Sequence, residues 1–544
     1  MNGIEILTIS ADEKIINGSR PSLYENQSSI FQNEVGMFQI AYRGENTNYQ
    51  QVQIKVNSEL AKFITIREVK PVVCSLYNRE NCDGYSVVQS AGAVSDILKD
   101  FKDLGISIRY NTFSSIFVTV KSKKALPKGT HKIIFTFLSE NQVLADINYT
   151  INVLEGFLPE TNLITTNWFH YDCLCDYYHV KPFSNKFYSI LKKQITNYVE
   201  HGMTMLLTPL FTPPLDTQIN GERRTIQLVK ISCEDNKYNF DFTELKRFMK
   251  EVEACGIKFF EFSHLFTQWG AWHAPKIVKY INNKEIKLFG WETNSLSDEY
   301  LDFLAQFLSG LREFILNNNY IDKIFIHISD EPNLIHLQKY GQLRQHIKKY
   351  FKEAIILDAI SDYSFYEKGY IDMPVVSLDH TEKFILNNVQ KYCVYYCMGQ
   401  RDEYVANGLI STPPERTRIL GFQMFLNKAK GFLHCGYNFY NSVFSIEKIN
   451  PFYENDCGGA FQSGDGFFVY PNSNGEVIDS LRHEYLLQAM QDYRVCLKAA
   501  EILGEDKVIK LLKENGMENY KKYTHSAIWL NELRCKIINE ITNF

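Results

Sequence analysis

Two adjacent carboxyl groups, Asp330 and Glu331, are the residues whose type and spacing most clearly suggest chemistry in this sequence. Four Asp-Glu dipeptides occur, and only this one directly follows a long apolar segment, IDKIFIHIS, and precedes a proline. Pro332 disfavours helical φ/ψ angles at Glu331, which predicts that the pair lies where the chain leaves a strand. A salt-bridged strand end or a helix cap is the structural alternative.

Neighbouring carboxyl groups fit one form of glycoside hydrolysis better than another. In ordinary glycosidases the two carboxyl groups flank the bond, about 5–5.5 Å apart for retention and about 6.5–9.5 Å for inversion. Neighbours at one strand end do not easily straddle a bond. In the substrate-assisted form the 2-acetamido oxygen of the sugar is the nucleophile, one carboxyl group protonates the leaving oxygen, and the other holds the amide N–H. The acid needs a raised pKa, which an apolar pocket provides.

The elements that must position this pair follow from the hydrophobic pattern. Residues 1–157 hold short, β-branched, often alternating segments between turns, which predicts an all-β sandwich domain. From residue 158 to 544 apolar strands alternate with amphipathic helices, which predicts a (β/α)8 barrel with C-terminal helices. The predicted barrel strands are 167–174, 203–209, 257–263, 323–329, 354–360, 373–378, 392–398 and 431–439.

Active sites of such barrels lie at the C-terminal ends of the strands, so the side chains there are candidates for substrate binding. Aromatic rings with carboxylates, amides and imidazoles suit a pyranose, which has apolar faces and a rim of hydroxyls. A single histidine or tyrosine at a strand end is more often part of the core, and it is their concentration at one end that favours a site. The candidates are Trp168, His170, His264, Trp269, Trp272, Trp291, His327, Asp358, Asp379, Tyr395, Tyr396, Tyr437, Asn438 and Asp465.

Other classes of function find less support. His327, Asp330, Asp358, Asp379 and His380 could converge on a metal, but no HxH, HExxH or DxDxDG spacing and no P-loop occurs, so we expect no metal and no cofactor. The net charge of −5 argues against a nucleic-acid partner, and no apolar run approaches the ~18 residues of a membrane span. The N-terminus does not read as a secretory signal, so we expect either a cytoplasmic protein or an exported one whose signal was removed. The scattered cysteines are expected to be free thiols.

Four segments together resemble glycoside hydrolase family 123: FIHISDEP, LHCGYNFY, GDGFFVYP and SLRHEYLLQAMQDYR. The resemblance implies a β-sandwich before a (β/α)8 barrel and a retaining exo-β-N-acetylgalactosaminidase that acts by substrate assistance on glycans or glycolipids. It further implies that Asp330 orients the acetamido group and that Glu331 is the general acid and then the base. A glycosidase for another hexosamine and a non-catalytic glycan-binding barrel are the alternatives. Arg482 and Glu484, in the last segment, are expected either to anchor a helix to the barrel or to contact substrate.

Overall fold

The computed structural model describes residues 3–77, 83–101, 104–235, 237–282, 284–400 and 403–542. The N-terminal part is a β-sandwich of two five-stranded sheets, ordered β1-β3-β8-β5-β6 and β2-β10-β9-β4-β7. Inward-facing side chains of both sheets form its core, where the rings of Phe38 and Tyr149 stack at 3.7 Å. The strands are β1 (Ile4–Ile9), β2 (Gln27–Phe31), β3 (Gly36–Gly44), β4 (Tyr49–Asn57), β5 (Ile64–Cys74), β6 (Gly92–Lys99), β7 (Ile106–Ile108), β8 (Ser114–Val120), β9 (Gly129–Ser139) and β10 (Gln142–Leu154).

An eight-stranded parallel barrel follows, in the order β11-β22-β21-β20-β19-β18-β15-β12. The backbone N–H of Thr204 donates to the carbonyl of Thr165 at 2.9 Å. This bond brings together β11 and β12, the two strands at the ends of that order. A sandwich followed by a (β/α)8 barrel is the predicted fold class, which is thereby confirmed. The strands are β11 (Ile164–Asn167), β12 (Met205–Thr208), β15 (Phe259–Phe262), β18 (Ile324–Ile326), β19 (Ile355–Ile360), β20 (Met373–Ser377), β21 (Cys393–Tyr395) and β22 (Gly431–His434).

The first barrel strand begins and ends earlier than the sequence predicted. It covers residues 164–167 instead of 167–174, and helix α1 begins at Tyr171. The backbone N–H of Trp168 still donates to His434 of the neighbouring strand, at 2.8 Å. The aromatic run that follows Asn167 therefore leaves the strand at once, which places Trp168 and His170 at the mouth of the barrel rather than inside a strand.

Helices surround the barrel, and two of the crossover helices are short. Helices α6 and α7 have four and five residues. The helices are α1 (Tyr171–Tyr177), α2 (Asn185–Glu200), α3 (Thr243–Glu253), α4 (Asp298–Asn317), α5 (Leu337–Tyr350), α6 (Ser364–Glu367), α7 (Glu382–Leu386), α8 (Pro414–Arg418), α9 (Leu420–Leu426), α10 (Leu481–Leu503), α11 (Glu505–Glu514) and α12 (Ala527–Thr542). Two-stranded ribbons add β13 (Lys230–Glu234) with β14 (Lys237–Asp241), β16 (Ile277–Ile281) with β17 (Lys284–Phe289), and β23 (Val469–Pro471) with β24 (Val477–Asp479). Within the described residues, no helix is long and apolar enough to cross a membrane.

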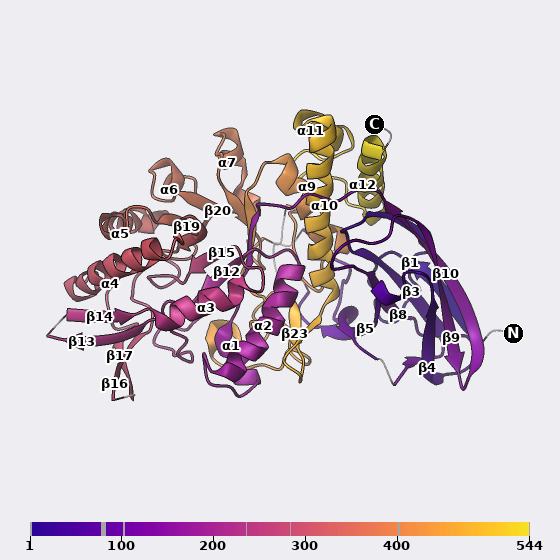
Figure 1. Ribbon diagram of the computed structural model, residues 1–544, viewed down its shortest axis with the longest axis horizontal. Helices are drawn as coiled ribbons and strands as arrows, with labels where there is room; N and C mark the ends of the chain where they lie inside the picture. The colour runs from indigo at the N-terminus through magenta and orange to yellow at the C-terminus, as the bar shows by residue number, and fades with distance from the viewer. Residues whose placement is uncertain are drawn as a thin grey trace.

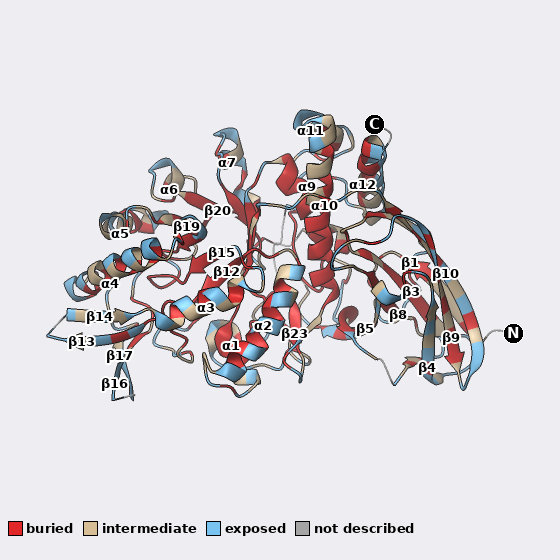
Figure 2. Cartoon of the chain, viewed as in Figure 1, coloured by how far each residue is buried: buried red, intermediate tan, exposed pale blue. Residues whose placement is uncertain are grey.

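Helix α10 stands between the barrel and the sandwich (Figure 1), and Figure 2 shows that most of its length is buried. Its Arg482 side chain is fully buried and pairs with Asp96 of β6, with Nε 2.9 Å from Oδ1. Its Glu484 accepts from Arg67 of β5 at 2.6 Å. The Arg482 guanidinium also donates to the carbonyls of Gly464 and Phe467, both at 2.7 Å. The expected anchoring of the helix to the barrel part of the chain is therefore found, and the ion pairs with Asp96 and Arg67 anchor it to the sandwich as well.

Candidate active site

A single cavity of about 290 Å³ opens at the C-terminal ends of the barrel strands and holds the Asp330-Glu331 pair. Five further predicted residues line it, and these are Trp168, His170, Trp269, Tyr395 and Asp465. The sequence interpretation missed other lining residues, among them Leu215, Asp216, Met398, Phe439 and Phe461. Aromatic and aliphatic walls surround a few carboxyl groups, a composition typical of a site for a small ligand with apolar faces.

The backbone around the pair is strained. Glu331 has φ of 44° and Trp269 has φ of 57°, in the left-handed region that residues with a Cβ rarely adopt. The N–H of Trp269 donates to the carbonyl of Asp330 at 2.8 Å, so the two strained loops hold each other. Such backbone strain persists where the surrounding structure fixes it. In this conformation the Glu331 carboxyl group lies against Tyr395, whose hydroxyl donates to Oε1 of Glu331 at 2.6 Å.

Both carboxyl groups of the pair have raised pKa values, and burial is the largest cause in each. Burial raises the pKa of Asp330 well above its ordinary value, and the charge of Glu331 adds to the rise. Burial also raises the pKa of Glu331, and Asp379 and Asp465 add to it, while hydrogen bonds from Tyr395 and Trp269 lower it. Within the described residues, no lysine, arginine or histidine pairs with either group. The pair titrates as a unit that keeps a proton above the ordinary carboxyl range.

A buried charged cluster lies beside the pocket. His327 of the segment that leaves β18 contacts Glu261 of β15 and Asp358 of β19 through its two ring nitrogens, at 2.6 and 2.7 Å. All three side chains are fully buried. Glu261 also accepts from the indole N–H of Trp168 at 2.7 Å, and Trp168 is a wall of the cavity. The cluster thus connects the end of β18, which precedes Asp330, to the pocket wall.

Comparison with known proteins agrees with this geometry. The model of the glycoside hydrolase 123 catalytic domain matches residues 168–497, which is more than half of the chain. The chain belongs to glycoside hydrolase family 123. Its fold is similar to that of a family 123 glycoside hydrolase from Clostridium perfringens, described as hydrolysing glycolipid glycans, with 15% identity, a TM-score of 0.75, and coverage of 99% of this chain and 97% of that one.

A family 5 mannosidase from Rhizomucor miehei is more distant, with 13% identity, a TM-score of 0.35, and coverage of 64% of this chain and 94% of that one. No match was found among curated proteins.

The remaining predicted residues of this family 123 hydrolase do not line the cavity. His264, His327 and Asp358 are buried beside it. The Tyr396 side chain is buried in the core, and Tyr437 donates to the amide oxygen of Asn197 at 3.0 Å on the opposite side of β22. The amide oxygen of Asn438 accepts from the backbone N–H of His170 at 2.7 Å and so supports the pocket from behind.

Three others lie around the rim of the barrel. The Trp272 ring is half-exposed and carries the ammonium of Lys339 over its face at 3.3 Å. The indole N–H of Trp291 donates to the Gly221 carbonyl at 3.0 Å. Asp379 binds the His380 ring at 2.7 Å and acts on Glu331 through its charge alone. Substrate binding by these three residues stays a prediction.

Asp216 is a lining residue that the sequence interpretation overlooked. It lies in the long loop after β12, with φ of 40°, and its carboxylate accepts from the backbone N–H of Phe444 at 3.0 Å. Burial raises its pKa to about 6. The signal was an aspartate following TPLFTPPL at a strand end, which is weak because the loop is too long for its position to be read from the pattern.

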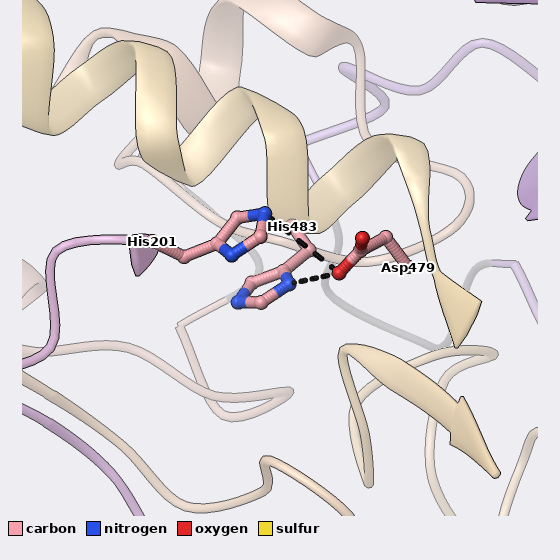
Figure 3. A group of neighbouring side chains, drawn as sticks. All are labelled: His201, Asp479 and His483. Atoms are coloured by element: carbon pink, nitrogen blue, oxygen red, sulfur yellow. Dashed lines mark hydrogen bonds and ion pairs between the residues drawn. The ribbon is translucent and has the colours of Figure 1, made fainter. Parts of the chain in front are cut away.

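Three groups of side chains place potential metal-binding atoms close together in the described part of the chain. In the first, His201, Asp479 and His483, the two imidazole rings stack at 3.6 Å with an angle of 13° between their planes (Figure 3). In the second, the rings of His264 and His327 stack at 4.2 Å with an angle of 22°. An imidazole lone pair lies in the ring plane, so two stacked rings cannot both bind one ion.

The third group, His434, Cys435 and Asp465, lies at the pocket. The backbone N–H of Gly436 donates to Nδ1 of His434 at 3.1 Å. Nδ1 also lies 3.3 Å from the amide oxygen of Asn167, and Nε2 lies 3.8 Å from Asp465. The contacts at Nδ1 leave Nε2 as the ring nitrogen that faces the carboxylate of Asp465.

Proposed function

We propose that this hydrolase is an exo-acting, retaining β-N-acetylgalactosaminidase that works by substrate assistance. The observation that carries the proposal is the Asp330-Glu331 pair, two adjacent carboxyl groups with raised pKa that line one cavity. About 290 Å³ suits one sugar residue better than a chain of sugars, which favours removal of a terminal unit.

The roles of the two carboxyl groups follow from their surroundings. Glu331 carries the proton and gives it to the glycosidic oxygen as the bond from C1 breaks, while the acetamido oxygen of the same sugar forms a new bond to C1. Asp330 accepts a hydrogen bond from the acetamido N–H and stabilises the positive oxazolinium ring. A hydrogen bond from this N–H favours ionised Asp330, so substrate binding leaves the shared proton on Glu331.

The second half of the reaction reverses the roles. Glu331, now ionised, takes a proton from water, the water oxygen attacks C1, and the oxazolinium opens to return the acetamido group. Two inversions at C1 give net retention. Aromatic walls from Trp168, Trp269 and Tyr395 supply the apolar surface that a pyranose face covers and keep water from the intermediate.

A panel of p-nitrophenyl glycosides tests the substrate. We expect hydrolysis of the β-N-acetylgalactosaminide and inhibition by N-acetylgalactosamine-thiazoline, a mimic of the bicyclic intermediate. Cleavage of another hexosaminide alone would contradict the proposed sugar. An active enzyme that the matching thiazoline does not inhibit would contradict substrate assistance, and glycan binding without any cleavage would favour the non-catalytic alternative.

A further inference from the structure

His327 occupies an unusual position for a histidine. It lies three residues before Asp330 in sequence, and its side chain is fully buried. Its Nε2 is 2.6 Å from a carboxylate oxygen of Glu261, and its Nδ1 is 2.7 Å from one of Asp358. An ionised carboxylate only accepts hydrogen bonds, so each ring nitrogen must carry a proton and the ring must be an imidazolium.

The other partners of the two carboxylates are donors as well, so both side chains act as hydrogen-bond acceptors toward all of these neighbours. Glu261 accepts from the Thr166 hydroxyl at 2.9 Å and from the Trp168 indole at 2.7 Å. Asp358 accepts from the Tyr340 hydroxyl. Burial alone would lower the pKa of His327, but the hydrogen bonds and charges of Asp358 and Glu261 raise it to about 10.

The same carboxylates hold parts of the active site. Asp358 accepts from the backbone N–H groups of Ile328 and Ser329, at 3.1 and 3.3 Å, and these are the two residues directly before Asp330. Glu261 fixes the ring of Trp168, which is a wall of the cavity. His327 joins both carboxylates, so one side chain connects the backbone that presents Asp330 to the wall that the sugar would contact.

We propose that His327 is a positioning residue, a permanent imidazolium that fixes the Asp330 strand end and the Trp168 wall and favours the ionised form of Asp330 during the reaction. The catalytic part of this inference rests on the proposed function. The groups that face His327 are Glu261 and the neutral ring of His264 from the β15 segment, Tyr340 from α5, Asp358 from β19, and Asp330. His264 stays neutral because burial, and then the charge of His327, hold its pKa well below the ordinary value. Among the side chains that face one another here, His327 is thus the one that carries a positive charge.

Nuclear magnetic resonance of the ¹⁵N-histidine-labelled full chain tests the protonation state without any substrate. We expect both ring nitrogens of His327 to remain protonated at pH 8, assigned by comparison with the His327→Gln variant. A His327 ring that becomes neutral below pH 7 would overturn the proposal whatever the enzyme's activity.

Kinetics of His327→Gln test the positioning role. We expect kcat to fall by about 10- to 100-fold with little change in KM, because the groups that bind the sugar remain while their alignment is lost. The imidazolium lowers the pKa of Asp330, and Asp330 must be ionised to act. Removing the imidazolium should therefore move the acidic limb of the pH profile of kcat upward by about one pH unit. His346→Gln on α5 is the matched control and should change neither quantity.

A second variant covers the case in which His327→Gln does not fold, since it leaves two carboxylates without a cation. The double variant His327→Gln/Glu261→Gln removes one charge of each sign and keeps an acceptor for Trp168. It should fold and should show an upward shift of the acidic limb that is smaller than that of His327→Gln, because the Glu261 charge that it also removes raises the pKa of Asp330. An unchanged pH profile in a folded variant would contradict the proposal. If Glu331→Gln retains full activity, the proposed function fails instead, and the protonation state of His327 is judged by the resonance experiment alone.

Discussion

Two pairs of carboxyl groups in this molecule have the same residue types and opposite electrostatics. Asp479 and Glu484, at the junction of sandwich and barrel, contact Arg67 at 2.9 and 2.6 Å, and the His201 ring lies 3.7 Å from each. Burial alone would raise the pKa of both groups, but His201 and Arg67 lower it below the ordinary value. The pKa values of Asp330 and Glu331 are raised instead, because burial acts there without a paired cation among the described residues.

The difference separates a structural pair from a reactive one. A carboxylate neutralised by a guanidinium gives up its proton and contributes to the junction between the two halves of the molecule. A carboxyl pair without a cation holds a proton that it can deliver to a leaving group. The charge of the neighbouring groups therefore tells more about whether a buried acid is reactive than its burial does.

Asp330→Asn gives the largest expected change in activity on an aryl glycoside. We expect kcat/KM on p-nitrophenyl β-N-acetylgalactosaminide to fall by about 10²- to 10³-fold, because an amide cannot stabilise the oxazolinium charge as a carboxylate does. Stability should not fall, since the substitution removes a repulsive charge next to Glu331. Steady-state kinetics and denaturant unfolding measure the two effects.

Asp479→Asn is the matched control, with the same substitution in the neutralised pair. There we expect lost stability and unchanged activity in the folded fraction. If both variants lose stability and keep activity, the contrast between the two pairs is wrong.

Arg67→Met gives the largest expected change in stability. It leaves Asp479 and Glu484 without their guanidinium, and we expect the free energy of unfolding to fall by about 3–5 kcal/mol. Because their pKa values would then rise, the loss should be greater at neutral pH than at pH 4, where protonation relieves the repulsion. Arg43→Met, which removes the partly exposed pair with Glu5 at 2.6 Å, should cost about 1 kcal/mol or less. Equal losses in the two variants would contradict a special role for the junction.

Tyr395→Phe should produce the smallest effect, a shift in pH dependence. The hydroxyl donates to Glu331 and lowers its pKa. Its removal should raise that pKa, so activity that requires protonated Glu331 should persist to higher pH, with the basic limb of kcat/KM moving upward. A downward shift, or none, would show that this hydrogen bond does not act on the catalytic proton.

The fold was largely predictable because buried parallel strands appear as continuous apolar runs, and seven of the eight barrel strands were located that way. The first strand was misplaced, since the predicted range 167–174 shares only Asn167 with β11. The Asp330-Glu331 pair could be singled out because a proline follows two acids at a strand end. Tyr395 and Tyr396 show a limit of prediction from the hydrophobic pattern. Successive side chains of a strand point to opposite faces, so Tyr395 lines the cavity and Tyr396 lies in the core. Which of two neighbours faces inward depends on register, and local sequence does not set it.

Glu261 and Asp216 show two further limits. Glu261 is a charged residue inside the apolar strand FFEF, a signal that could have been recognised as an inward-facing acid needing partners. Asp216 lies in a long loop whose path depends on contacts with the loop around Phe444, more than 200 residues later. Such long-range contacts leave no trace in spacing.

The leaving-group dependence of Glu331→Gln tests most directly whether the reactive pair supplies the acid. The rate constants of the variant and the wild type are compared on p-nitrophenyl β-N-acetylgalactosaminide and on a disaccharide with terminal β-linked N-acetylgalactosamine. We expect a loss of about 10²- to 10⁴-fold on the disaccharide, whose leaving alcohol needs a proton, and a much smaller loss on the aryl glycoside, whose leaving group does not. Equal losses on the two substrates would contradict the role of Glu331 as general acid.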